Sequence, residues 1–194
     1  GRLARRALSL NSLATAHLAE GQVEESLRLL HAAVELARQV GDLRTLALAQ
    51  VNLGVAYSEK GEGEAASRHY EEGLTTFRKI GDQASEARTL YNAGVLRVQA
   101  GALVQAEEAF AEALELARRL GMKHFESTVR RQRAECALQR GEVDRALGEC
   151  DQAEALAREA GSSVEVMLAR LKRIEVKLSV DAGPAEDFAL AACE

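Results

Sequence analysis

The sequence contains few aromatic residues and a single proline, Pro184. Phe, Trp and Tyr make up 4% of the 194 residues, whereas strong helix formers such as Ala, Leu, Arg and Glu dominate. No run of roughly 18 apolar residues is present, so no membrane-spanning helix is expected. The first residues also lack the apolar core of a signal peptide. Because 47% of the residues are hydrophobic, the chain is expected to be ordered and all-α rather than a disordered tail.

Cysteine is scarce as well, and the net charge is negative. The three cysteines, Cys136, Cys150 and Cys193, have neither metal-binding nor disulfide-like spacing, which favours a reducing, cytoplasmic compartment. The formal net charge is −5, with both signs interspersed along the chain. A nucleic-acid partner normally requires a concentrated positive face, so the charge argues against one. Arginine outnumbers lysine by 20 to 5, which together with the alanine content favours a bacterial source.

Glycine, in contrast, is abundant and regularly placed. Eight of the fifteen glycines recur every 20 residues. They are Gly21, Gly41, Gly61, Gly81, Gly101, Gly121, Gly141 and Gly161. A glycine directly after a helix can adopt the left-handed conformation that ends it, so the spacing predicts helices separated by tight turns. Asp42, Asp82 and Ser162 follow three of these glycines, Gly41, Gly81 and Gly161, and are expected to be helix N-caps, so the true repeat has two helices and 40 residues.

The expected helix pairs are 2–20 with 22–40, 42–60 with 63–80, 82–100 with 102–120, 122–140 with 142–160, and 162–180 with 184–194. Aligning the sequence at a period of 40 gives columns of small residues. One column holds Ala14, Gly54, Gly94 and Ala134; a second holds Ser26, Ala66, Ala106 and Ala146; a third holds Ala33, Gly73, Ala113 and Ala153. A fourth column holds the larger side chains expected to face them, which are Leu30, Tyr70, Phe110, Cys150 and Leu190.

This order of small, turn-forming and bulky residues resembles the tetratricopeptide repeat. The usual period of about 34 is shorter, and about 40 is also found in HEAT and armadillo repeats, but the columns match tetratricopeptide packing and the first helices contain no proline. The long repeat is similar to that of the Leu-Gly-Asn family of G-protein modulators and of bacterial signalling regulators. The resemblance implies a right-handed superhelical α-solenoid of antiparallel helix pairs, with four and a half to five repeats in one domain, 1–194. The expected repeats are 2–41, 42–81, 82–121, 122–161 and an incomplete 162–194, in what we expect to be a fragment of a longer protein.

The resemblance also implies where a ligand binds, because the first helix of each pair lines the concave face in this family. Asn52 and Asn92 match positions that hydrogen-bond the backbone of an extended peptide, and Gln132 takes the same position in the fourth repeat. Arg88 matches an arginine that contacts acidic ligand groups. Neighbouring columns add Asn11, Val51, Val55, Tyr91 and Arg131. The expected ligand is an extended peptide or a partner helix with a carboxylate near Arg88 and Arg131.

Two residue patterns depart from regular packing. Arg130 and Arg133 occupy columns that are usually apolar, so the fourth repeat is expected to pack irregularly. Ile174 is too large for its small-residue column, so the fifth repeat is expected to pack differently. Arg131 has an alternative role too, since it can simply pair with a nearby glutamate.

No catalytic, cofactor-binding or metal-binding pattern is found. Of the histidines, His17 is expected to pack in place of a tyrosine, and His31, His69 and His124 to lie on solvated faces. Cys136 and Cys150 are expected to be small buried hydrophobes. The sequence therefore favours a protein–protein interaction module in a signalling or regulatory protein. The alternatives are a sensor of a small molecule or signalling peptide that controls an attached effector, a repeat array that self-associates through its exposed ends, and a designed repeat protein.

Overall fold

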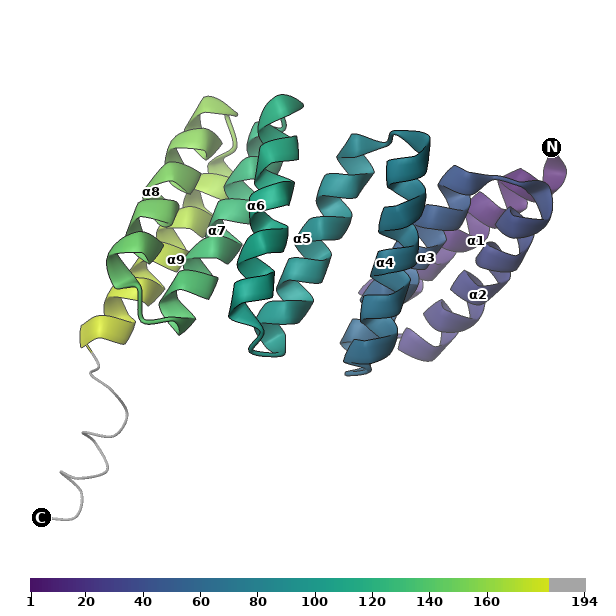
Figure 1. Cartoon of the computed structure of the whole chain (residues 1–194), viewed down its shortest axis with the longest axis horizontal. Coiled ribbons are helices and arrows are strands. Elements are labelled where there is room, and N and C mark those ends of the chain that lie inside the picture. The colour runs from purple at the N-terminus through teal and green to yellow at the C-terminus, as the bar shows by residue number, and fades with distance from the viewer. Residues whose placement is uncertain (182–194) are drawn as a thin grey trace, which may run out of the picture. The chain divides into compact units, whose positions relative to one another are not determined.

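The computed structural model describes residues 1–181, all of which form helices or the tight turns between them (Figure 1). The helices are α1 (Arg2–Ala19), α2 (Val23–Val40), α3 (Leu43–Glu59), α4 (Gly63–Ile80), α5 (Gln83–Gln99), α6 (Leu103–Arg119), α7 (Lys123–Gln139), α8 (Val143–Glu159) and α9 (Ser163–Asp181). Each of these helices agrees with its expected range to within one residue at both ends. The helix expected at 184–194 lies outside the described residues.

The regular glycines end the helices as expected. All eight have positive φ, for example φ 71° at Gly41 and φ 73° at Gly81, a left-handed conformation that non-glycine residues rarely adopt. After Gly41, Gly81 and Gly161, the next residue caps the following helix with its side chain. Asp42 accepts a hydrogen bond from the backbone N–H of Thr45, and Asp82 accepts one from that of Ser85. The N–H of Glu165 donates to Ser162 Oγ at 3.3 Å.

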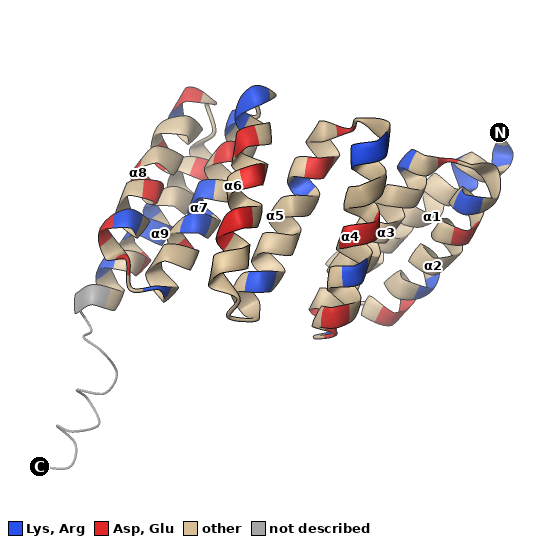
Figure 2. Cartoon of the chain, viewed as in Figure 1, with Lys and Arg blue, Asp and Glu red and all other residues tan. Residues whose placement is uncertain are grey.

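The chain divides into two compact units, residues 1–113 and residues from 114 onward, and the division falls within α6. In the first unit, α1 packs with α2, α3 with α4, and each pair with the next; α1 also contacts α3, and α3 contacts α5. In the second unit, α7 and α8 form a pair that packs against α9. Charged residues of both signs are scattered along the helices of each unit (Figure 2).

Packing within each pair follows the expected columns of small and bulky residues. Ala14, Gly54, Gly94 and Ala134 are buried, and so are the bulky residues Leu30, Tyr70, Phe110 and Cys150. The two glycines lie beside rings: a Cβ built on Gly54 would be 2.6 Å from the Tyr70 ring, and one on Gly94 would be 2.5 Å from the Phe110 ring. The aromatic rings therefore occupy the space that a methyl group fills elsewhere.

The fourth repeat departs from regular packing through buried charge. Arg130 is only 5% exposed and donates from Nη1 to Glu149 Oε2 at 2.7 Å. Arg133 pairs with the other oxygen of Glu149 at 3.0 Å, and Glu126 accepts from both Arg118 and Arg130. Arginines at apolar positions are thus accommodated by carboxylates that the facing helix α8 and the preceding turn of α7 supply.

The helix α9 exposes a row of large apolar side chains. They are Val164, Met167, Leu171, Ile174 and Leu178, spaced three and four residues apart. Ile174 is 52% exposed in the described part of the chain, whereas the small residues of its column in the other repeats are buried.

Candidate functional site

The first unit presents a face built from α1, α3 and α5, the first helices of their pairs. Asn52 on α3 donates from Nδ2 to Asn11 Oδ1 on α1 at 2.8 Å, and Asn11 is only 7% exposed. At the repeat period of 40 residues, Asn52 corresponds to Ser12 rather than to Asn11. The two asparagines meet because neighbouring helices are offset, so that residues 41 apart face each other.

Three of the expected site residues meet at the next joint along this face. Val55 on α3 and Tyr91 and Asn92 on α5 line one hollow of about 190 Å³. The remaining lining residues are Ser58, Glu59, Tyr70, Val95 and Gln99. Since Asn52 lies one helical turn before Val55, the asparagine pair and the hollow occupy neighbouring parts of α3.

Val51 has a different environment. A Cβ built on Gly73 of α4 would be 2.6 Å from Val51 Cγ2, so this side chain fills the space above Gly73 within its own helix pair. Residues 51 and 52 differ by about 100° around the helix, which separates the packing role of Val51 from the surface position of Asn52.

Arg88 lies on α5, as Tyr91 and Asn92 do. It is exposed and has no ion pair with any of the residues described.

In the second unit, the first helices of the pairs are linked by ion pairs. Arg131 on α7 forms an ion pair with Glu165 on α9 at 3.1 Å. Pairing with a nearby glutamate was the second role considered for Arg131 from the sequence. Lys172 on α9 donates to Glu135 on α7 at 2.9 Å. The pKa of Glu135 is lowered by hydrogen bonds from Lys172 and Gln139, which outweigh the opposing effect of its burial. Gln132 is half-buried on α7. Any ligand carboxylate at Arg131 must therefore compete with Glu165.

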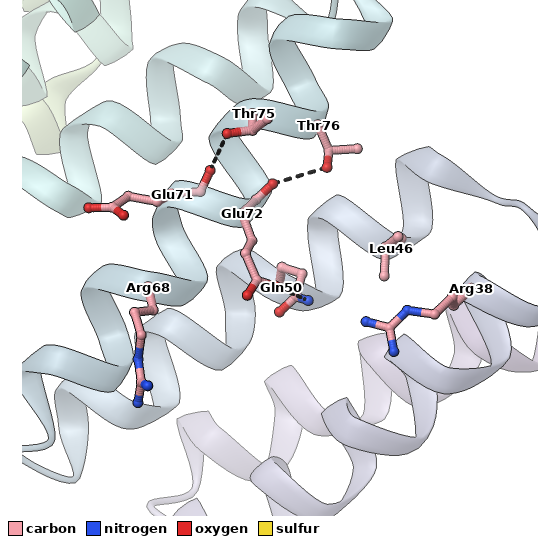
Figure 3. Close-up of a pocket in the computed structure, with 8 residues that line it drawn as sticks. All are labelled: Arg38, Leu46, Gln50, Arg68, Glu71, Glu72, Thr75 and Thr76. Atoms are coloured by element: carbon pink, nitrogen blue, oxygen red, sulfur yellow. Dashed lines mark hydrogen bonds between the residues drawn. The ribbon is translucent and has the colours of Figure 1, made fainter.

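A larger hollow of about 480 Å³ lies over α2, α3 and α4 (Figure 3). Most of its polar groups already have partners, although Arg68 forms no hydrogen bond or ion pair with the residues described. Gln50 is 5% exposed and donates to Glu72 at 2.6 Å, and Thr75 and Thr76 donate to backbone oxygens one turn earlier. Arg38 approaches from α2 and is paired with Glu35 at 2.9 Å. Because these groups are mutually satisfied, this hollow offers a ligand fewer open hydrogen-bonding groups than its size suggests.

His69 lies beside this hollow and differs from its expected solvated position. It is half-buried, its Nδ1 is 2.7 Å from Gln50 Oε1, and its ring stacks on that of Tyr57 with centroids 5.2 Å apart. Burial lowers the pKa of His69, and the nearby His31 and Arg68 act in the same direction. This contact could not be predicted from the sequence, because His31, Tyr57 and His69 lie on three different helices.

The cysteines and histidines provide no evident metal site. Cys136 and Cys150 are buried thiols as expected, and burial raises the pKa of Cys150 to about 11. In the described part of the chain, no group of three or more His, Cys, Asp or Glu side chains is arranged to hold a metal ion. No helix among residues 1–181 is long and apolar enough to cross a membrane.

The repeat geometry agrees with comparisons to known proteins. The sequence matches the family described as tetratricopeptide repeat over residues 5–79 and again over residues 45–119, which together cover more than half of the chain. The chain therefore belongs to the tetratricopeptide repeat family. This fold is a scaffold for protein–protein interaction and is typically non-catalytic. A search of curated protein sequences finds no match.

Three solved structures illustrate the likeness of the fold. A protein of Podosopora anserina described as a kinesin light chain, with nearly identical TPR-like repeats, is 16% identical over 94% of this chain and 90% of that one, with a TM-score of 0.77. Aspartyl phosphate phosphatase F from Bacillus subtilis is 14% identical over 97% of this chain and 48% of that one, with a TM-score of 0.84. A signal transduction ATPase with numerous domains from Pyrococcus horikoshii, which has a tetratricopeptide repeat sensor, is 19% identical over 88% of this chain and 27% of that one, with a TM-score of 0.77. At these identities the likeness concerns the fold alone.

Proposed function

We propose that the α1–α3–α5 face of the first unit binds an extended peptide segment of a partner protein. The observation that supports this most is the meeting of Val55, Tyr91 and Asn92 at one hollow beside the Asn11–Asn52 pair. An amide side chain offers both a donor and an acceptor, which suits it to the backbone of an extended peptide. Asn92 has no hydrogen-bond partner among residues 1–181, so its amide is available to a ligand.

The exposed Arg88 on the same helix supports a ligand that also carries an acidic group. It has no carboxylate partner among the residues described, unlike Arg131, which is held by Glu165. We therefore assign the acidic contact to Arg88 and treat Arg131 and Gln132 as secondary contacts of the second unit. A contact to Arg88 is exposed and is expected to weaken as salt is added.

We further propose that the whole chain acts as one interaction domain of a cytoplasmic bacterial signalling or regulatory protein. The excess of arginine over lysine and the buried thiols of Cys136 and Cys150, which are not joined in a disulfide, support this setting. The second candidate, a domain that senses a small molecule, requires an enclosed site with converging polar groups. Most polar groups that line the α2–α4 hollow already have partners, which favours the peptide-binding proposal over this candidate.

The test is selection of binding peptides from a displayed library of random segments of roughly ten residues, followed by titration of the selected peptides. Changing both Asn52 and Asn92 to Ala is expected to weaken binding by roughly 1–3 kcal/mol per residue, because each removes hydrogen bonds to the peptide backbone. Gln152→Ala, an exposed amide on α8, is the matched control and is expected to leave affinity unchanged.

Circular dichroism of each variant establishes that the helices are intact. Selection of no peptide, or equal affinity of folded wild-type and doubly substituted protein, would overturn the proposed peptide face.

A further inference from the structure

The hollow between α3 and α5 is lined by a tyrosine whose hydroxyl group no part of the described chain uses. Tyr70 belongs to α4. Its ring lies against Gly54 of α3, and the residue also lines the hollow. The residue is only 4% exposed, yet its hydroxyl has no hydrogen-bond partner among residues 1–181. In the other helix pairs the same column holds Leu30, Phe110 and Cys150, none of which has a hydroxyl. This group therefore distinguishes the α3–α5 joint chemically from the others.

The charge lining this hollow is negative. Glu59, at the end of α3, is exposed and forms no ion pair with the residues described. Burial raises the pKa of Tyr70 above its ordinary value, and the charge of Glu59 adds to this effect. The hydroxyl thus stays protonated at neutral pH. None of the residues found to line the hollow is Lys, Arg or His, so Glu59 is not neutralised from within.

The walls between these polar groups are largely apolar. Val55 and Val95 face the hollow from α3 and α5, and Tyr91 and Asn92 complete it. The volume of about 190 Å³ is below the ~300–1,000 Å³ typical of small-molecule sites. It suits one long side chain of a larger ligand.

We propose that this hollow receives an arginine or lysine side chain of the bound peptide; the inference rests on the proposed peptide-binding face. The methylene stem of the guest lies against Val55 and Val95. Its cationic head donates hydrogen bonds to the Glu59 carboxylate and to the oxygens of Tyr70 and Asn92. An acidic guest would be repelled by Glu59, and an apolar guest would leave all three polar groups without a partner.

The test uses the same displayed peptide library on the complete 194-residue chain. Peptides selected by the wild-type protein are expected to share one position enriched in Arg or Lys. Replacing that residue by norleucine, which keeps an unbranched apolar stem, should weaken binding roughly tenfold. Glu59→Gln should cause a similar loss for the basic peptide and little loss for its norleucine counterpart.

Two further variants sharpen the test. Glu59→Lys should shift the selected residue from Arg or Lys to Asp or Glu. Tyr70→Phe should weaken the basic peptide by roughly three- to tenfold, and its fold should be retained because Phe110 packs on Gly94 in the same way. Glu64→Gln is the matched control, because it removes the same charge from an exposed position of α4 that does not line the hollow.

The outcomes separate this inference from the proposed function. Selected peptides that require Asn52 and Asn92 but show no basic position overturn the basic-residue pocket and leave the peptide face standing. Basic peptides that bind equally well to the Glu59→Gln and Glu64→Gln variants also overturn it. A library that yields no binders overturns both proposals.

Discussion

Gly54 and Gly94 each lie beneath the aromatic ring of the facing helix, where a single methyl group has no room. A Cβ on Gly94 would be 2.5 Å from the Phe110 ring, closer than real Cβ atoms come to other side chains. In the first repeat, the corresponding residues Ala14 and Leu30 are also fully buried. There the small residue is larger than glycine and the facing residue is smaller than an aromatic ring. Small and large residues are thus chosen jointly across each helix pair.

Gly94→Ala is expected to destabilise the protein by about 1–3 kcal/mol, since the buried Phe110 ring must shift. Combining it with Phe110→Leu should recover part of the loss, because this pair reproduces the Ala14–Leu30 arrangement. Urea denaturation of the two single variants and the double variant gives the coupling, expected at roughly 1–2 kcal/mol.

Gly148→Ala on α8 is the control for the same chemical change. No neighbouring atom lies within 4 Å of the added Cβ, and the residue is inside a helix, so a stabilisation of about 0.5–1 kcal/mol is expected. Additive effects at positions 94 and 110 would show that the glycine and the ring do not depend on each other.

At the residue scale, the sequence predicted part of the candidate site. Val55 on α3 meets Tyr91 and Asn92 on α5 because α3 and α5 are the first helices of neighbouring pairs and contact each other. Asn11 was assigned to a different column from Asn52, because a column comparison ignores the offset between adjacent helices. Tyr70 was predicted correctly as a packing residue, but the role of its hydroxyl was missed. Only the structure shows that the ring lies against Gly54 and that Tyr70 also lines the hollow between α3 and α5.

At the scale of single helices, the start of the first helix in each pair is unevenly stabilised. Asp82 accepts hydrogen bonds from both the N–H and the hydroxyl of Ser85, and Asp42 does the same with Thr45. Met122 takes the corresponding position before α7 and has no side chain that can cap the helix. The fourth repeat therefore begins with more unsatisfied backbone N–H groups than the second or third.

Opposite effects are expected when the cap is removed and when it is added. Asp82→Ala should lower stability by about 1 kcal/mol, and Met122→Asp should raise it by a similar amount. Thermal unfolding followed by circular dichroism measures both. Asp82→Asn keeps an acceptor for Ser85 while losing the 3.2 Å ion pair with Arg44, so it separates capping from charge. A loss for Asn equal to that for Ala would mean that the ion pair, not the cap, carries the effect.

The helix boundaries were predictable because they depend on local chemistry. A glycine with positive φ ends one helix, and Asp42, Asp82 or Ser162 begins the next. The irregular fourth repeat was only partly predictable. The sequence identified Arg130 and Arg133 as misplaced in apolar columns, but not that Glu149 on α8 lies opposite both of them.

At the scale of the whole molecule, buried charge is concentrated in the second unit. Glu149 is 7% exposed and holds two arginines, while Glu154 is 4% exposed and pairs with Arg158, Arg170 and Arg173. The hydrogen bond from Arg170 is the main cause that lowers the pKa of Glu154. In the first unit, the cluster around Leu30 and Leu53 is apolar.

Glu149→Ala is expected to destabilise the second unit by about 3–5 kcal/mol, because it leaves the charge of Arg130 buried without its closest partner. Since each repeat contacts only its neighbours, the effect should stay local. Hydrogen exchange followed by mass spectrometry should show faster exchange in residues 114–181 and little change near α1 and α2. Exposed Glu115→Ala is the control and should change stability by less than about 0.5 kcal/mol. Equal acceleration throughout the chain would instead indicate that it unfolds as one cooperative block.

The missing methyl group at Gly54 also constrains how the proposed binding site can arise in evolution. With alanine at this position, the Tyr70 ring could not lie across α3, and its hydroxyl could not reach the opposite side. With glycine but a smaller facing residue, the helix pair would contain a void. Neither change is favourable by itself, so the two positions are epistatic: a repeat with Ala and Leu at these positions, such as Ala14 and Leu30, acquires this hydroxyl only through a paired substitution. The proposed recognition by Tyr70 therefore depends on a packing position, Gly54, on the neighbouring helix of the same pair.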